Sequence, residues 1–158
     1  MNNRSSQVSD VKTCIEYNVD QIKDVAQALA LLRKTCAIFT FTGSLGAGKT
    51  TLVQALLKEC GIVGPITSPT FTYFNVYENS QGQKFYHFDC YRLTSLDDFL
   101  QAGFDEYLYQ PNSWVFIEWP ELIMPLLTHD CCHIAIEYKN EYKRILTYSE
   151  EDFGVKNG

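Results

Sequence analysis

The segment Gly43-Ser-Leu-Gly-Ala-Gly48-Lys49-Thr50 holds the residue types that a protein needs to bind phosphate groups. It satisfies the P-loop pattern G-x-x-x-x-G-K-[ST] in full. Glycines let the backbone turn with its N–H groups facing inward, Lys49 supplies a positive charge, and the Thr50 hydroxyl can complete the shell of a Mg²⁺ ion. The alternative is a tight turn with a solvated lysine. A random chain of this length would match the pattern on the order of once in a hundred or fewer.

The residues on either side of this segment fit the context that the pattern requires. Residues 36–42 form an apolar and β-branched run, typical of a strand buried on both faces of a parallel sheet. Residues 51–60 have helical spacing and stop at Gly61. We therefore expect a strand, a glycine loop and a helix. The loop amides from Gly46 to Thr51 and the positive end of the helix would then enclose a phosphate.

A P-loop needs an acidic partner for magnesium, and two buried-strand patterns end in a carboxylate. Val115-Phe-Ile-Glu118 has the layout of a Walker B element with Glu in place of Asp, and Phe85-Tyr-His-Phe-Asp89 is the other candidate. For each carboxylate the alternative is an exposed strand end paired with a cation.

The segment Ile66-Thr-Ser-Pro-Thr-Phe71 lies between the P-loop helix and these two strands. Ser68-Pro69 favours a turn, and Thr70 presents a hydroxyl. Loops in this position often sense the γ-phosphate and are ordered by Mg²⁺ and phosphate. An ordinary Ser-Pro turn is the other interpretation.

The rest of the chain predicts a single α/β domain whose sheet mixes parallel and antiparallel strands, with helices on its flanks. We expect this P-loop NTPase fold over residues 13–149, with a flexible N-terminus at 1–12 and a flexible tail at 150–158. Further strands are expected at residues 13–17, 71–77, 85–91, 113–118, 133–138 and 143–148, and further helices at 19–32 and 96–100.

The composition is that of a globular protein with an acidic second half. The net charge is −6; residues 1–77 hold seven Lys/Arg and five Asp/Glu, whereas residues 78–158 hold six and fourteen. Because nucleic-acid binding gains most of its affinity from contacts of Lys and Arg with phosphates, we expect that this protein does not bind nucleic acid directly. The carboxylates either keep the protein soluble or face a basic partner.

The six cysteines lack the regular spacing of a secreted disulfide framework, and several fall within apolar runs. The first ten residues are polar, and the sequence contains no apolar stretch long enough to span a membrane. We therefore expect a cytoplasmic protein with no membrane association. The adjacent residues Cys131, Cys132 and His133 cannot easily arrange their side chains as tetrahedral metal ligands. We therefore interpret the two cysteines as thiols within a strand.

Four elements in order resemble one family, the bacterial TsaE (YjeE) ATPases of tRNA threonylcarbamoyladenosine biosynthesis. They are GSLGAGKTT at residues 43–51, SPTFT at 68–72, HFDCYRL at 87–93 and IEWPE at 117–121. The resemblance covers residues 18–148. It implies ATP hydrolysis in support of the TsaB and TsaD transferase subunits. These attach a threonylcarbamoyl group to the adenosine beside the anticodon in tRNAs that read codons beginning with A, and tRNA would be held indirectly through that complex. Because the sequence offers no evident arginine finger unless Arg92 serves, we expect this hydrolysis to be slow and stimulated by partners.

Carried over by position, the resemblance assigns residues to ATP or ADP and to Mg²⁺. It implies a catalytic set of Lys49, Asp89, Glu118 and Thr70, and metal ligands Thr50 and Glu118 with Asp89 close by. It implies that the nucleotide is contacted by Ser44, Leu45, Gly46, Ala47, Gly48, Lys49, Thr50, Thr51, Trp119 and Lys143. By spacing alone, Trp119 fits a core position as well as a ligand contact, and Arg92 fits a phosphate contact or a structural ion pair.

The chain departs from the family pattern in two places, both near the base and ribose. Ile22 and Ala26 stand where the family favours Ser or Thr and then Gly, and Tyr142-Lys143-Arg144 replaces a Gly-Arg pair. Lys143 is our candidate there.

A P-loop is compatible with three other functions. The sequence has no Asn-Lys-x-Asp element for guanine, which argues against a classical GTPase. A small-molecule kinase would need a lid rich in arginine, but the arginines are Arg4, Arg33, Arg92 and Arg144, without clustering. A module that binds nucleotide without hydrolysing it is the third alternative.

Overall fold

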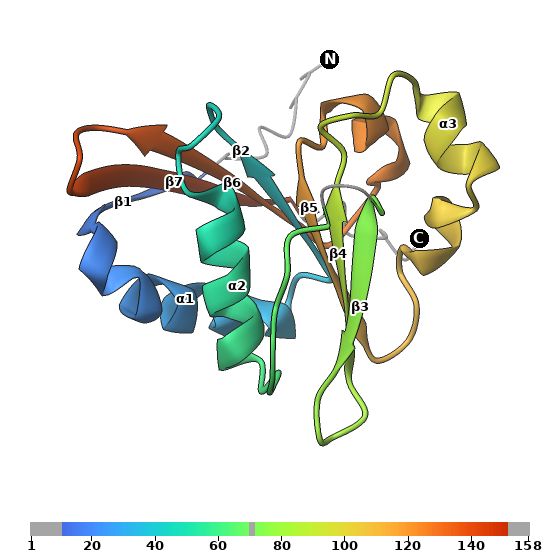
Figure 1. Cartoon of the computed structure of the whole chain (residues 1–158), viewed down its shortest axis with the longest axis horizontal. Helices are drawn as coiled ribbons and strands as arrows, with labels where there is room; N and C mark the ends of the chain where they lie inside the picture. The colour runs from blue at the N-terminus through green and yellow to red at the C-terminus, as the bar shows by residue number, and fades with distance from the viewer. Residues whose placement is uncertain (1–10, 70–71, 152–158) are drawn as a thin grey trace, which may run out of the picture.

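One seven-stranded sheet organises the part of the chain that the structure describes (Figure 1). The computed structural model describes residues 11–69 and 72–151. The strands are β1 (Thr13–Asn18), β2 (Ile38–Thr42), β3 (Phe74–Glu78), β4 (Lys84–Asp89), β5 (Ser113–Glu118), β6 (Cys131–Tyr138) and β7 (Lys143–Glu151). Their order in the sheet is β1-β7-β6-β2-β5-β4-β3.

The centre of the sheet is parallel and its margins are antiparallel. β2 pairs in parallel with both β5 and β6, and β4 pairs in parallel with β5. β3, β7 and β1 are added antiparallel to β4, β6 and β7, respectively. The carboxyl ends of β2, β4 and β5 therefore meet at the same edge of the sheet, which is where ligands bind in open α/β sheets.

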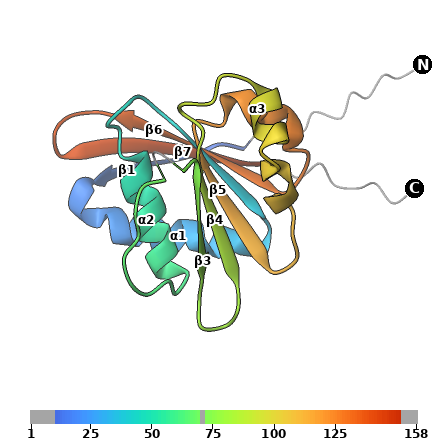
Figure 2. The same ribbon diagram turned by 45° about the vertical axis from the view of Figure 1, so that its right-hand side comes forward.

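Helices cover both faces of the sheet (Figure 2). α1 (Ile22–Ala30) and α2 (Lys49–Glu59) lie on one face, and short 3₁₀ turns, η1 (Val19–Gln21) and η2 (Leu31–Lys34), extend α1 at its two ends. α3 (Leu96–Gln101), η3 (Phe104–Tyr107) and η4 (Glu121–Leu126) lie on the other face of β4 and β5.

An aromatic layer fills the core between the sheet and α2. Phe116 lies at its centre, with its ring edge-on to Phe39 and Phe41 and stacked on Phe85. All four rings are fully buried. Leu52 and Leu56 of α2 belong to the same core. This layer fixes α2, and with it the loop that precedes α2, against the ends of the central strands.

The mixed α/β sheet predicted from the sequence is confirmed, and the boundaries of several elements move. The helix predicted at residues 19–32 splits into η1, α1 and η2, and in η1 the Gln21 side chain accepts a hydrogen bond from the Asn18 amide at 2.8 Å. The helix predicted from Thr51 begins at Lys49, so Lys49 and Thr50 lie in its first turn. β7 runs to Glu151, so Glu150 and Glu151 belong to the sheet although the sequence assigned them to a tail.

Within residues 11–69 and 72–151, no helix is both long and apolar enough to cross a membrane.

Truncating Phe116 to alanine should lower the free energy of unfolding by about 3–5 kcal/mol, because it opens a cavity among three other buried rings. Urea unfolding measures this value. Tyr142→Ala, at a side chain that is 66% exposed, is the control and should change stability by less than about 0.5 kcal/mol. Equal effects of the two variants would contradict the position of Phe116 in the core.

Candidate functional site: a cleft at the glycine loop

The glycine loop joins β2 to α2 and needs backbone conformations that other residues avoid. Gly48 precedes the helix with φ of 110°. Gly43 has φ of 148°, and a Cβ there would collide with the Ile136 carbonyl oxygen of β6. The loop therefore passes close to the sheet backbone before the helix begins. This brings the N-terminus of α2, with its unpaired N–H groups and partial positive charge, to the sheet edge.

Lys49 is buried beneath this loop. Its side chain is only 5% exposed, and Nζ donates to the carbonyl oxygens of Gly43 at 2.6 Å and Ser44 at 2.9 Å. Nζ also lies 4.1 Å from the centre of the Trp119 ring, a cation–π distance. Burial lowers the pKa of Lys49, and the carboxylates of Glu118, Glu121 and Asp89 partly offset that effect. The ammonium is thus held inside the loop, where an anion would meet it.

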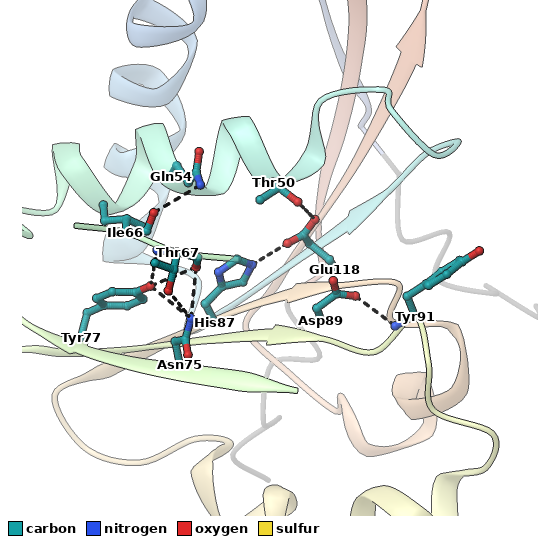
Figure 3. Close-up of polar contacts among 10 residues, drawn as sticks. All are labelled: Thr50, Gln54, Ile66, Thr67, Asn75, Tyr77, His87, Asp89, Tyr91 and Glu118. Atoms are coloured by element: carbon teal, nitrogen blue, oxygen red, sulfur yellow. Dashed lines mark hydrogen bonds and ion pairs between the residues drawn. The ribbon is translucent and has the colours of Figure 1, made fainter. Parts of the chain in front are cut away.

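Glu118 links three elements at the end of β5 (Figure 3). Its Oε1 accepts a hydrogen bond from the Thr50 hydroxyl at 2.6 Å, and its Oε2 lies 2.5 Å from Nε2 of His87 on β4. The Glu118 side chain is 2% exposed and His87 is fully buried. Glu118 is therefore not the exposed strand end that the sequence left open as an alternative.

Asp89 lies beside Glu118, because parallel pairing places the two residues opposite each other in register. Its Oδ1 accepts a hydrogen bond from the Tyr91 amide at 3.1 Å. Burial raises the pKa of the Asp89 carboxyl, and the nearby charge of Glu118 adds to this. The two carboxylates that sequence analysis proposed as alternatives thus lie at the same site.

Trp119 follows Glu118 directly and turns away from the sheet. Its backbone has φ of 55°, a left-handed conformation that is unusual for a tryptophan. The turn places the ring between Lys49 and Tyr91, whose ring centre is 4.9 Å away. Trp119 is half-buried: it forms part of the cleft wall and also packs against the hydrophobic cluster that includes Ile117 and Ile123.

The cleft has a volume of about 390 Å³. It is lined by Leu45, Gly46, Gly48, Lys49, Thr50, Thr51, Ser68, Asp89, Tyr91, Arg92, Glu118 and Trp119. Among the other predicted contacts, Ser44 and Ala47 belong to the loop but not to this lining, and Thr70 lies outside the described residues. Most of the predicted loop residues and the carboxylates of both strand ends thus lie around one cavity.

The segment that leads to Ser68 is tied down at its base (Figure 3). Asn75 of β3 donates to the Thr67 carbonyl oxygen at 3.1 Å, and the Tyr77 hydroxyl donates to the same oxygen at 3.2 Å. On the other side, the Gln54 amide of α2 reaches the Ile66 carbonyl oxygen at 3.5 Å. These contacts hold residues 66 and 67 between α2 and β3, next to the cleft.

Lys143 does not line the cleft. Its Nζ lies 3.5 Å from Glu16, whereas the neighbouring Arg144 donates from Nε to the Ala47 carbonyl oxygen of the loop at 3.0 Å. Successive side chains of a strand point to opposite faces, so only one of the two can face the loop. The spacing in sequence does not reveal which of them does.

Two residues at the site carried no predicted role. Tyr91 covers Trp119, and His87 lies below Glu118. A signal for His87 exists in the sequence: residues two apart in a strand share a face, so His87 and Asp89 must point the same way. Its pairing with Glu118 depends on the register between β4 and β5, which local sequence does not specify.

The residues that build the cleft lie within a stretch that matches a known protein family. The family model described as "Threonylcarbamoyl adenosine biosynthesis protein TsaE" matches residues 17–146. The chain belongs to the TsaE family. This membership was predicted from the four sequence elements and is confirmed.

Individual TsaE proteins and a solved structure agree with this membership. The TsaE protein of Rickettsia felis is 37% identical over 138 residues, which cover 85% of this chain and 79% of that protein. The Bacillus subtilis TsaE protein is 32% identical over 132 residues, which cover 84% of this chain and 81% of that protein. The crystal structure of Bacillus subtilis YdiB has a TM-score of 0.64 and 27% identity, and the match covers 90% of this chain and 88% of that one. The predicted P-loop NTPase fold is likewise confirmed.

Asp89→Asn should make the protein more stable than the wild type at neutral pH. The folded-state pKa of Asp89 is raised above its ordinary value of 3.8, so the folded protein binds the proton more tightly. Stability is therefore lost as the pH rises through the folded-state pKa, and the substitution removes this loss. Urea unfolding at several pH values should show the difference vanish below the ordinary pKa.

Asp98→Asn is the matched control, and its expected effect on stability at neutral pH has the opposite sign. Hydrogen bonds from Thr94 and Ser95 lower the pKa of Asp98, so its stabilising contribution is present above the ordinary pKa and is lost as the pH falls. Asp98→Asn should therefore destabilise the protein at neutral pH. Destabilisation by Asp89→Asn as well would contradict the unfavourable burial of the Asp89 carboxylate.

Proposed function

We propose that this chain binds Mg·ATP in the cleft and hydrolyses it slowly, in support of the threonylcarbamoyl modification of tRNA. The observation that carries the proposal is the convergence of Lys49, Thr50 and Glu118 at the N-terminus of α2. Membership in the TsaE family, which is named for threonylcarbamoyl adenosine biosynthesis, supports a role in this tRNA modification. The modified base is the adenosine beside the anticodon in tRNAs that read codons beginning with A.

The loop fits the phosphate groups of ATP and ADP. Its glycines hold the backbone close to the helix N-terminus, where a phosphate accepts hydrogen bonds from main-chain amides. Lys49 already donates to two carbonyl oxygens of the loop, so its Nζ is positioned for an entering phosphate oxygen. The proposed contacts run from Ser44 to Thr51, and Trp119 closes the wall beside Lys49.

The donor set at the cleft fits Mg²⁺, which prefers oxygen ligands and keeps several waters. The Thr50 hydroxyl and the Glu118 carboxylate lie 2.6 Å apart, and Asp89 lies opposite Glu118 in the sheet. We propose that Thr50 and Glu118 hold the ion, with Asp89 close to it. When bound, Mg²⁺ would neutralise charge on the β- and γ-phosphate oxygens.

The protein side chains have separate roles in the proposed hydrolysis. Lys49 stabilises the charge of the transferring phosphoryl group through its buried ammonium. Asp89 orients the attacking water for in-line displacement. The resemblance to the family suggests that Thr70, which lies outside the described residues, helps to hold this water. Among the described residues that line the cleft, Arg92 is the one arginine. Intrinsic turnover should be slow and stimulated by partners, because no arginine cluster stabilises the transition state.

We propose the TsaB and TsaD transferase subunits as partners, with tRNA held by that complex. The resemblance to the family supports the partners. The net charge of −6 supports indirect contact with tRNA, because polyanion binding needs basic surface.

Reconstitution tests the proposal. Labelled ATP, tRNA and the two partner subunits are incubated with the wild-type chain, with Lys49→Ala or with no chain, and both released phosphate and modified tRNA are measured. We expect phosphate release to water that the partners increase, and tRNA modification that depends on the chain. Transfer of the label to a metabolite would instead identify a kinase, and binding without turnover would identify a nucleotide-dependent module.

Lys49→Ala should reduce ATP hydrolysis and tRNA modification by about 10²-fold or more, because it removes the buried cation at the phosphate site. Lys58→Ala removes an exposed lysine from the same helix and should have no effect, which makes it the matched control. Thermal unfolding shows whether each variant is folded. Modification at the wild-type rate by folded Lys49→Ala would overturn the proposed role of the cleft.

A further inference from the structure

His87 is a polar residue buried in an otherwise aromatic part of the sheet. On β4 it lies between Phe85 and Asp89 on the face toward α2, and it is fully buried. On the neighbouring strand, Phe116 is its partner in register. An apolar side chain would fill this position at lower cost, because a buried imidazole loses its hydrogen bonds to water. The histidine at this position therefore needs an explanation beyond packing.

The contacts of His87 point to one partner. Its Nε2 lies 2.5 Å from Oε2 of Glu118, while its Nδ1 has no hydrogen-bond partner among the described residues. A proton on Nδ1 would leave a buried donor unsatisfied and would set the Nε2 lone pair against the carboxylate oxygen. A proton on Nε2 makes a charge-assisted hydrogen bond to Glu118. The arrangement therefore requires the proton on Nε2.

This hydrogen bond fixes the direction of the Glu118 carboxylate. With Oε2 held by His87 from the interior, Oε1 is directed toward the Thr50 hydroxyl at the floor of the cleft (Figure 3). A carboxylate attached to a flexible side chain would otherwise turn toward the nearby Lys49, which shares the cleft.

We propose that His87 is a positioning residue that holds Glu118 in the orientation needed for the divalent cation of a bound Mg-nucleotide. This inference rests on the proposed function, since it assumes that Thr50 and Glu118 hold that cation. Residues that hydrogen-bond to a metal ligand orient it, and their loss typically weakens metal binding or activity by about 10–100-fold. A purely structural role in joining β4 to β5 would instead leave metal affinity unchanged in a folded variant.

Metal binding in the presence of ADP separates the two roles. Mn²⁺ replaces Mg²⁺ and is titrated by electron paramagnetic resonance, and ADP binding without metal is measured by calorimetry in a chelator. We compare wild type, His87→Leu and His87→Gln, because the Gln side-chain amide can place a donor where Nε2 lies. His133→Leu is the control, since His133 contacts Thr40 and Glu151 and does not line the cleft.

We expect His87→Leu to weaken Mn²⁺ binding by about 10–100-fold while metal-free ADP binding stays within about threefold. His87→Gln should restore most of the Mn²⁺ affinity, and His133→Leu should match the wild type in both titrations. Wild-type Mn²⁺ affinity in His87→Leu, or no rescue by His87→Gln, would overturn the positioning role while leaving the proposed function intact. Absence of Mn²⁺·ADP binding by the wild type would overturn both.

A spectroscopic measurement on the wild type does not depend on the folding of any variant. Nitrogen-15 spectra of the histidine rings distinguish a proton on Nε2 from one on Nδ1. We expect His87 to carry its proton on Nε2. A proton on Nδ1 alone would overturn the proposal, because Nε2 could then not donate to Glu118.

Discussion

The structure of the site depends on a carboxylate buried at the end of a parallel strand. Glu118 is 2% exposed, and a buried charge is stable only when it is paired and hydrogen-bonded. The partners come from separate elements: Thr50 from the first turn of α2 and His87 from β4, with the Lys49 ammonium in the same cleft. The hydrogen bonds of the buried Glu118 carboxylate thus require α2, β4 and β5 to meet at the same edge of the sheet.

The same face of the sheet changes character along its strands. Near the middle, Phe39, Phe85 and Phe116 pack against α2, while the strand ends carry Asp89 and Glu118. Burial of the apolar part fixes the position of α2. Because α2 is fixed there, the Thr50 hydroxyl lies next to the carboxylates of Asp89 and Glu118 at the strand ends. His87 lies at the boundary of the two parts and belongs to the polar one through its contact with Glu118.

Local patterns in the sequence were sufficient for the loop and for the carboxylates. The glycine loop is recognisable because strand, loop and helix are contiguous, and Asp89 and Glu118 are recognisable because each ends an apolar run. Contacts between distant segments were not predictable in this way. The pairing of His87 with Glu118 depends on strand register, and the approach of Arg144 rather than Lys143 to the loop depends on which face of β7 turns inward.

A crystal structure of the chain with ADP and Mn²⁺, with the metal located by its anomalous scattering, tests the central claim most directly. We predict a Mn²⁺ peak bonded to Thr50 Oγ1 and next to the Glu118 carboxylate, with the β-phosphate enclosed by the amides of residues 46–51. A nucleotide whose phosphates lie outside this loop, or a metal bound away from Thr50 and Glu118, would contradict the account.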